Sequence, residues 1–350
     1  MVKNILGWDI GGAHLKVSAL NASGQITDAL ILSCPLWKGM DQLTKSLALV
    51  DDHFSIKDTL HAITMTGELV DLFQSRRHGV EAIIEVMQKQ FGRSNLRIFA
   101  GNKGFLKLPE LDVNSIDDIA SANWFASAYL VANKINNGLL IDIGSTTSDL
   151  ITIKNAEVQT QGFTDFERLV SDELVYTGII RTPVMAVAQS VEFNGEKVGL
   201  MAEHFATMAD IFRLTGEINE SHDLSDTADG AAKTPKASAR RLARMMGSDV
   251  ESENLLPWEQ LAAQLRSKQV SRLLKACEKQ LARSNLCSDD CFVGAGIGRF
   301  LAKELANQLG HPYIDFNQLL NYPLNQTTVS VADVAPAASV AYLLGTAINP

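Results

Sequence analysis

The first third of the chain alternates between strand-like and helix-like hydrophobic patterns. Short runs that are apolar throughout, or that alternate apolar with polar residues, predict strands at 2–8, 15–20, 26–33, 60–67 and 96–101. Apolar positions three and four residues apart predict helices at 40–54, 79–92 and 115–135. Gly92 is placed to close the second helix, and Ser115 is expected to cap the third. Strands followed by alternating helices and strands indicate an α/β half-molecule.

The same pattern restarts at Gly138. The strands predicted in this half are 137–141, 148–153 and about 156–161. They are followed later by an amphipathic helix at 258–285, a strand, glycine turn and helix at 290–310, and a closing helix at 331–345. Residues 162–250 are less periodic and predict an insertion, in which the polar, turn-rich stretch 221–241 is expected to be a loop or lid.

A short motif occurs twice at matching places in the two halves. DIGGAHLKVSAL (9–20) and DIGSTTSDLITI (142–153) each follow an apolar run and lead into an alternating one. The repeat is far too long to be a solenoid unit, so it indicates an internal duplication. We therefore expect two similar α/β domains, residues 1–136 and 137–350, with the insertion at about 162–250 in the second.

Each copy plants a carboxylate, Asp9 or Asp142, beside a glycine turn at the end of a strand. The glycines, Gly11, Gly12 and Gly144, let backbone N–H groups approach an anion closely. The carboxylates would repel a phosphate but suit Mg2+, which takes one or two carboxylates together with phosphate oxygens. The second copy adds the hydroxyl donors Ser145, Thr146 and Thr147. One such turn could be an ordinary hairpin, but the paired occurrence predicts a site for Mg2+ and a diphosphate or triphosphate.

Glu68 and Lys16 are further candidates near the first turn. Glu68 follows a strand, and functional side chains gather at strand carboxyl ends in open α/β sheets. It could accept a proton or hold a metal-bound water, although an acid near a helix start is equally explained by the helix dipole. Lys16 lies on the same side of its strand as His14 and could reach a phosphate or extend along the surface, and His14 could be a plain turn residue.

Charged residues in the insertion are candidates for substrate binding. They are Arg181, Asp229, Arg240, Arg241 and Arg244. Arginine forks bind phosphate and carboxylate groups through two hydrogen bonds, and Asp229 precedes Gly230 in a polar loop. A solvated helix face explains the arginines at 240–244 equally well.

Composition narrows the function classes. The chain has 350 residues, 46% hydrophobic and 20% charged, with a formal net charge of -9, which argues against a nucleic-acid binder. No apolar run of 18 residues is evident and the first aspartate comes early, so neither a membrane span nor a signal peptide is expected. Cys287 and Cys291 have a loosely zinc-like spacing without a second pair, so free thiols in a cytoplasmic protein are preferred. A homo-oligomer is left open.

The paired DxGG and DxGST turns resemble the phosphate motifs of the actin, hexokinase and Hsp70-like superfamily. The resemblance implies two ribonuclease-H-like domains around a central nucleotide cleft, with a late glycine-rich turn against the adenosine. GAGIG fits that turn and contributes Gly294, Gly296 and Gly298. A dinucleotide-binding domain is rejected for GAGIG, because the third glycine of G-x-G-x-x-G is missing and too few residues follow Asp315.

Several segments together resemble the hydantoinase A and oxoprolinase group. They are TMTGELVDLF (64–73), IDIGSTTSDLI (141–151), YTGIIRTPV (176–184), DTADGAAKT (226–234) and RRLAR (240–244). The similarity is greatest to the branch linked to tetrahydromethanopterin-dependent one-carbon metabolism. This implies a transferase of methanofuran- or methylofuran-type cofactor biosynthesis, which condenses an aminomethylfuran diphosphate with a glutamylated tyramine- or tyrosine-like phenol and releases pyrophosphate.

Two other functions stay open within this superfamily. One is an ATP-dependent kinase or ring-opening amidohydrolase, and the other is a nucleotide-binding regulatory protein without catalysis. Ala13 and His14 stand where many sugar kinases place hydroxyl or amide residues, which favours a diphosphate substrate over ATP hydrolysis. We therefore expect Asp9, Asp142 and Glu68 to be the catalytic residues, with Mg2+ at the two aspartates.

Overall fold

The structure is a computed structural model that describes residues 4–54, 59–320, 322 and 329–348. Its internal contacts separate the chain into two compact units. Unit 1 comprises Met1–Leu140, Ile151–Glu167 and Ile314–Pro350, and unit 2 comprises Ile141–Leu150 and Arg168–Tyr313. The division at residue 136, which concerns the two duplicated halves, stays a prediction.

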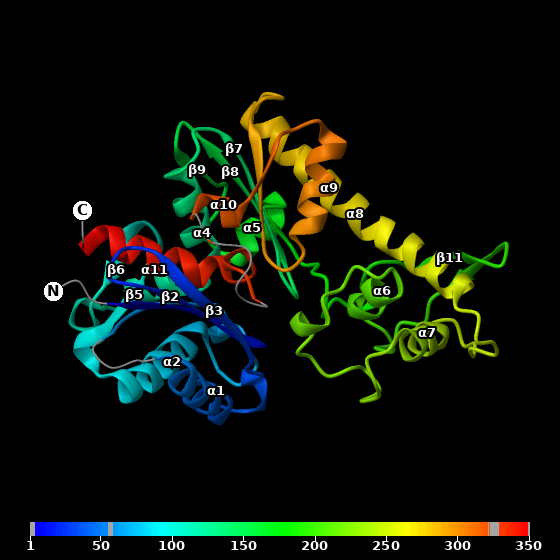
Figure 1. The fold of residues 1–350 in the computed structure, drawn as a ribbon, viewed down its shortest axis with the longest axis horizontal. Coiled ribbons are helices and arrows are strands. Elements are labelled where there is room, and N and C mark those ends of the chain that lie inside the picture. The colour runs from blue at the N-terminus through cyan, green and yellow to red at the C-terminus, as the bar shows by residue number, and fades with distance from the viewer. Residues whose placement is uncertain (1–3, 55–58, 321, 323–328, 349–350) are drawn as a thin grey trace. The chain divides into compact units, whose positions relative to one another are not determined.

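Unit 1 is built on a six-stranded sheet of order β3-β2-β1-β4-β5-β6 (Figure 1). Its strands are β1 (Ile5–Ile10), β2 (His14–Leu20), β3 (Ile26–Ser33), β4 (Leu60–Met65), β5 (Leu96–Phe99) and β6 (Phe105–Leu106). The first two strands form the predicted antiparallel hairpin, in which Asp9 lies opposite Lys16. Strand β4 runs parallel to β1, so the ends of these two strands meet at one edge of the sheet.

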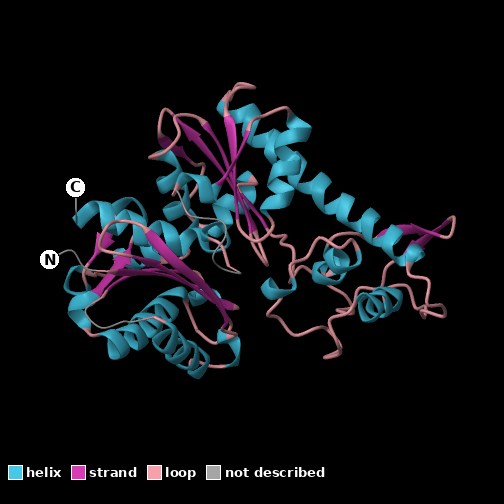
Figure 2. Cartoon of the chain, in the orientation of Figure 1, coloured by secondary structure: helices cyan, strands magenta, loops and turns pink. Residues whose placement is uncertain are grey.

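Helices cover both faces of this sheet. Helices α1 (Asp41–His53) and α2 (Arg76–Phe91) lie on one face and α11 (Ala335–Ile348) on the other, as Figures 1 and 2 show. The apolar stripes of α1 and α2 share a core with Trp8 and the other inward residues of β1. A Cβ on Gly7 would lie 2.0 Å from the carbonyl oxygen of Ala337, so β1 accepts α11 only because this position lacks a side chain.

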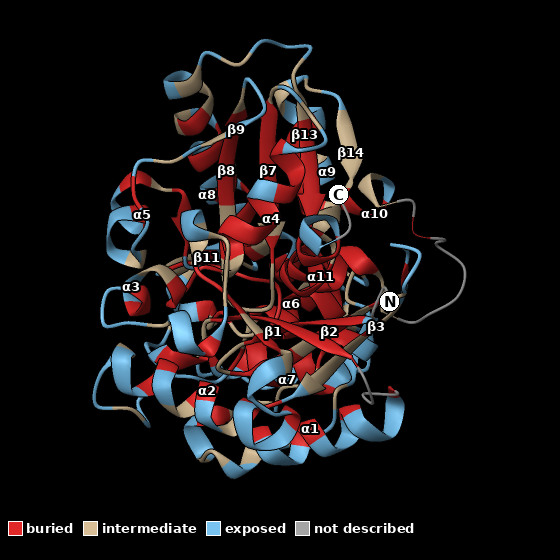
Figure 3. Cartoon of the chain, turned by 90° about the vertical axis from the view of Figure 1, so that its left-hand side faces the viewer, coloured by how far each residue is buried: buried red, intermediate tan, exposed pale blue. Residues whose placement is uncertain are grey.

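The sequence 331–348 also has the length and composition of a membrane span, which differs from the expectation that no such stretch exists. It consists of a short 3-10 helix, η8 (Val331–Val334), and α11. The window is 72% buried within the protein, and Figure 3 shows α11 in the buried colour. Its apolar character therefore serves the contact with the first sheet.

The predicted long helix at 115–135 is wrong in one respect, because it is broken in the middle. The structure has α3 (Ser115–Ile119) and α4 (Asn123–Ala132), with Ser121 between them in a left-handed conformation, φ 53°. Ser115 is the first residue of α3 and not its cap. The predicted closure of α2 is confirmed, since the Gly92 N–H donates to Gln88 O.

A second sheet repeats the order of the first. Its order is β10-β8-β7-β13-β14, with β9 paired to the other end of β8. The strands are β7 (Gly138–Ile143), β8 (Ser148–Lys154), β9 (Glu157–Gln159), β10 (Leu174–Val175), β13 (Cys291–Ala295) and β14 (Tyr313–Asp315). The path β9-β8-β7-β13-β14 corresponds to β3-β2-β1-β4-β5, which confirms the duplication predicted from the repeated motif.

The remaining elements of unit 2 include α8 (Leu256–Ser284) and α9 (Arg299–Leu309), which follow the insertion in the sequence. The insertion itself contains α6 (Met208–Leu214), α7 (Pro235–Arg244), and the hairpin of β11 (Ser190–Phe193) with β12 (Glu196–Gly199). Two shorter helices, α5 (Asp165–Ser171) and α10 (Phe316–Leu319), connect other elements. The expectation that 221–241 is wholly a loop or lid is wrong from residue 235 onward, where α7 begins under a Thr234 cap.

Candidate active site

The segment that we call turn one, residues 9–16, closes with one backbone hydrogen bond, from Gly11 N–H to His14 O at 3.0 Å. A carboxylate at a strand end that faces a cleft is expected to be solvated, but Asp9 is 2% exposed. Its Oδ2 lies 3.2 Å from Lys16 Nζ, and its Oδ1 accepts a hydrogen bond from Asn123 Nδ2 at 3.4 Å. Gly12 approaches Val70 so closely that an added Cβ would lie 2.7 Å from Cγ1 of that valine.

Turn two, residues 142–149, repeats this backbone with different side chains. Gly144 N–H donates to Thr147 O at 2.9 Å, which is the counterpart of the bond in turn one. Asp142 and the residues Gly144 to Thr147 are half-buried, so the hydroxyls of Ser145 and Thr146 are accessible. The Ser145 and Thr146 hydroxyls are 3.4 Å apart.

The segment after β10 packs directly on turn two through its backbone. The N–H groups of Ile180 and Arg181 both donate to Ser145 O, at 3.1 and 2.8 Å. A Cβ on Gly178 would lie 2.4 Å from the backbone nitrogen of Thr146, so no larger residue fits there without displacing the turn. The Arg181 guanidinium donates to Thr146 Oγ1 at 3.3 Å, and burial lowers its pKa.

The glycine-rich turn 294–298 also reaches turn two. Gly298 N–H donates to Ile143 O at 2.8 Å. Gly296 has φ 77°, and a Cβ at this position would lie 2.4 Å from the Asp142 carboxylate. Gly294 instead packs on the Tyr313 ring. Two of the three predicted glycines therefore contact turn two and the strand before it, Gly296 at Asp142 and Gly298 at Ile143.

Glu68 is buried in unit 1 just after β4, in a 3-10 turn spanning Gly67–Leu69. Its Oε1 accepts a hydrogen bond from Ser121 Oγ at 2.9 Å, while Oε2 has no hydrogen-bond partner among the described residues. Burial raises the pKa of this carboxyl, and the hydrogen bond from Ser121 and the nearby charge of Arg76 offset this only in part. An acid with a raised pKa in such a place is a candidate for proton transfer.

The sequence did not identify four residues that surround these acids. Ser121 and Asn123, at the break between α3 and α4, contact Glu68 and Asp9 respectively. Arg76 forms an ion pair with Asp165, and both lie near Ser121. The available signal was the polar pair Ser121 and Asn123 within an otherwise apolar helical pattern.

Four of the five predicted substrate-binding residues of the insertion lie together in unit 2, whereas the fifth, Arg181, contacts turn two. Arg240 and Arg244 are exposed on α7, as the solvated-face alternative expects. Arg241 on the same helix is instead buried, and its guanidinium contacts Asp210 and Asp229. The solvated face is therefore wrong for Arg241.

Asp9 and Asp142 are the candidate metal ligands of the two turns. Among the residues that the structure describes, no three His, Cys, Asp or Glu side chains form a metal cluster. One carboxylate at the strand end of each turn matches the number that Mg2+ commonly takes when phosphate oxygens and waters complete its shell. Asp142 fits this role with its half-exposed position, whereas Asp9 already has an ammonium group beside it. Cys287 and Cys291 are free thiols, as predicted.

Known proteins resemble this chain over most of its length. The profile of the hydantoinase/oxoprolinase family matches residues 59–336. A protein of Methanocaldococcus jannaschii named (4-{4-[2-(gamma-L-glutamylamino)ethyl]phenoxymethyl}furan-2-yl)methanamine synthase is 37% identical over 248 residues, covering 71% of this chain and 72% of that protein. A protein of the same name from Methanococcus vannielii is 27% identical over 221 residues, covering 63% of this chain and 96% of its own.

A likeness to solved structures concerns the fold. Nucleotide-free acetone carboxylase, from work on ATP-dependent acetone carboxylation, has a TM-score of 0.57 at 11% identity, over 96% of this chain and 70% of its own. The predicted fold class, an α/β protein of the actin-like kind, is confirmed.

Proposed function

Because the chain belongs to the hydantoinase/oxoprolinase family, we propose that it is the ether-forming transferase of a methanofuran-type cofactor pathway. The substrates are an aminomethylfuran diphosphate and a phenol that carries a γ-glutamyl group, a tyramine or tyrosine derivative. Two relatives support this proposal, because both are named as synthases of a γ-glutamylaminoethyl-phenoxymethyl furan methanamine. We place the reaction in the cytoplasm.

The proposed reaction exchanges one carbon–oxygen bond for another. The phenol oxygen attacks the CH2 group on the furan ring, and the bond from that carbon to the diphosphate oxygen breaks. The bonding pair leaves with pyrophosphate, while the phenol gives up its proton to a base. A furan ring stabilises positive charge on the attached carbon, so the leaving group is the part that needs help from the protein.

Turn two is the part of the chain that best supports diphosphate binding. The hydroxyls of Ser145, Thr146 and Thr147 can donate to phosphate oxygens, and Arg181 is held beside Thr146. The observation that carries the proposal is the fit of Gly178 and Gly296 against this turn, because positions that tolerate no side chain fix the donors before substrate arrives. Mg2+ at Asp142, when bound, would neutralise negative charge on the departing pyrophosphate.

We assign proton acceptance to Glu68. Its Oε2 lacks a hydrogen-bond partner among the described residues, and burial raises its pKa, which makes its carboxylate a stronger base than that of an ordinary glutamate. Ser121 orients the carboxyl through Oε1, and Arg76 with Asp165 completes the polar surroundings. In its ionised form, Glu68 takes the phenol proton as the new ether bond forms.

The test is a reaction with defined substrates. Purified protein with Mg2+ is incubated with the aminomethylfuran diphosphate and γ-glutamyltyramine, and ether product and pyrophosphate are followed by mass spectrometry and a coupled assay. We expect one pyrophosphate per ether formed, with no requirement for ATP. Steady ADP formation without a phenol would contradict the proposal and support a kinase.

A further inference from the structure

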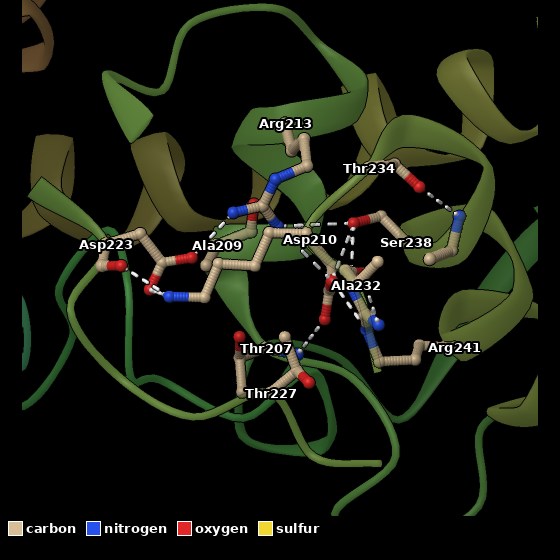
Figure 4. Close-up of polar contacts among 12 residues, drawn as sticks. Thr207, Ala209, Asp210, Arg213, Asp223, Thr227, Ala232, Thr234, Ser238 and Arg241 are labelled. Atoms are coloured by element: carbon tan, nitrogen blue, oxygen red, sulfur yellow. Dashed lines mark hydrogen bonds and ion pairs between the residues drawn. The ribbon is translucent and has the colours of Figure 1, made fainter. Parts of the chain in front are cut away.

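A network of buried charges in the insertion fixes one face of α7. Asp210 Oδ1 accepts hydrogen bonds from Ser238 Oγ at 2.7 Å and from Arg241 Nε at 2.8 Å. Arg213 donates to Ser238 Oγ at 3.3 Å and forms an ion pair with Asp223 at 2.6 Å (Figure 4). All five side chains are buried. Satisfied polar networks of this kind hold their members in one geometry.

Arg241 extends this network to Asp229. Its Nη1 donates to Asp229 Oδ1 at 3.0 Å and to Ala232 O at 3.3 Å. Burial raises the pKa of Asp229, but the Ala231 N–H and Arg241 outweigh this, so the pKa lies below its ordinary value and the group is a carboxylate. These two hydrogen bonds reach Oδ1, whereas Oδ2 lies 3.8 Å from Arg240 Nη2. Asp229 Oδ1 is therefore held by Arg241 and the Ala231 N–H, while Oδ2 forms a long ion pair with the exposed Arg240.

Beside Asp229 lies a cavity of about 370 Å³, a size typical of small-molecule sites. Its lining includes Arg240 and Arg244, one helical turn apart on α7, together with the ring of Phe205. Their side chains are 52% and 57% exposed. Arg244 contacts exposed Asp249 at 3.2 Å, and a surface pair of this kind is easily exchanged for another anion.

We propose that this cavity binds the α-amino-acid end of the γ-glutamyl group of the phenolic substrate. Arg240 and Arg244 receive the α-carboxylate, and Asp229 Oδ2 receives the α-ammonium. Phe205 offers an apolar wall to the rest of the substrate. The assignment rests on the proposed function, because a γ-linked glutamyl group keeps both charges free.

Charge argues against the diphosphate as the occupant. Asp229 lines the cavity and would repel a dianionic ligand, but it matches an ammonium group. A cation pair beside a fixed carboxylate is the pattern that a zwitterion requires.

The first test compares ligands with and without the glutamyl group. Isothermal titration calorimetry measures the Kd of γ-glutamyltyramine, tyramine and pyrophosphate for the wild type and for Arg240→Gln/Arg244→Gln. We expect γ-glutamyltyramine to bind about 10- to 100-fold more weakly to the double variant, with the other two unchanged. Lys236→Gln is the control, since Lys236 on the same helix pairs with Glu253 outside the cavity lining.

Other results would overturn the assignment. Unchanged γ-glutamyltyramine binding, or an equal loss for all three ligands, would remove the glutamyl site. Selective loss of pyrophosphate would make the arginines a diphosphate site. Failure of the proposed function is separate: a wild type that binds γ-glutamyltyramine through these arginines but forms no ether keeps the site and loses the reaction.

The second test addresses Asp229 with a desamino substrate. Glutaryltyramine has the carboxylate but not the α-amino group. We expect Asp229→Asn to weaken binding of γ-glutamyltyramine about tenfold and to leave glutaryltyramine unchanged. Equal losses for both compounds, in a variant with unchanged thermal unfolding, would contradict contact with the ammonium.

Discussion

Turn one and turn two share a backbone but are surrounded in different ways. In both, the N–H of the first glycine donates to the carbonyl three residues later. Neighbouring backbone groups donate to both turns, from Cys34 and Leu36 at turn one and from Ile180 and Arg181 at turn two. At turn one, Lys16 and Asn123 also contact the Asp9 carboxylate. At turn two, Gly178 and Gly296 lie so close that neither position has room for a side chain.

This difference lies in the side chains that occupy matching positions of the two copies. Lys16 neutralises the aspartate of turn one, whereas its counterpart at turn two is the acid Asp149, which bonds to buried Arg168 at 2.6 Å. Turn two has hydroxyls where turn one has Gly12 and Ala13. The two copies thus share a turn backbone but differ in side chains, with acids buried near one copy and half-buried hydroxyl residues at the other.

The largest expected effect comes from removing either aspartate. Asp9→Asn and Asp142→Asn should each lower kcat about 100-fold or more, by analogy with the loss of one electrostatic stabiliser. If both aspartates act on the same metal and diphosphate, the double variant should lose less transition-state stabilisation than the two single variants lose in sum. Measuring kcat over a range of Mg2+ concentrations tests this, and two fully active variants would exclude the turns from the active site.

Stability distinguishes the same two variants. Asp9→Asn removes a buried partner of Lys16 and should lower the free energy of unfolding by about 1–3 kcal/mol. Asp142→Asn should change it little, because Asp142 is half-buried. Thermal unfolding of both variants checks the difference, and equal melting temperatures would remove it.

Backbone fit at turn two is tested by Gly178→Ala. The added methyl would lie 2.4 Å from Thr146 N, so the turn must move, at a cost of about 1–3 kcal/mol in stability. Displaced donors should lower kcat/KM by up to about 100-fold. Gly199→Ala is the matched control, because no atom lies within 4 Å of its added Cβ. Similar behaviour of the two variants would show that close contact at Gly178 does not matter.

The sequence predicted what depends on local pattern. The strands on either side of the repeated Asp-Ile-Gly turns, the internal duplication that they indicate and the amphipathic helix at α8 are all confirmed. The start of α7 could also have been predicted, because Thr234-Pro235 is a pair typical of a helix start. The polar composition of the surrounding residues favoured a loop instead.

The contacts of the acids could not be predicted in the same way. Both sides of Ser121 have a helical pattern, and the break between α3 and α4 accompanies contacts to Glu68 and Asp9, far away in the sequence. The burial of Arg168 and Arg241 could not be predicted for the same reason, because their partners Asp149 and Asp210 come from other elements. No local periodicity records such pairings.

The Glu68→Gln variant tests whether the buried Glu68 carboxyl near turn one makes the stability of the protein depend on pH. The pKa of Glu68 is raised in the folded protein, mainly by burial, so its protonated form is favoured there. The contribution of this group to the free energy of unfolding is fully present below the pKa that the group has in the unfolded state. It is lost as the pH rises through the higher pKa of the folded state. Glu68→Gln should therefore be more stable than the wild type at pH 8, with a difference that shrinks toward pH 4. Thermal unfolding across pH measures this. Exposed Glu81→Gln is the control, and a pH-independent difference would contradict the assignment.

The smallest expected effect concerns the residue type that adopts a left-handed backbone near each turn. Near turn one this residue is Ser121, φ 53°, and at turn two it is Gly296, φ 77°. Ser121→Gly and Ser121→Ala both remove the hydroxyl that donates a hydrogen bond to Glu68. Only glycine also removes the steric cost of the left-handed conformation. The glycine variant should therefore be more stable than the alanine variant by about 1 kcal/mol. Urea unfolding of both variants measures the difference directly, because the lost hydrogen bond is common to them. If the two variants are equally stable, Ser121 carries no backbone strain, and its role at turn one is reduced to the hydrogen bond with Glu68.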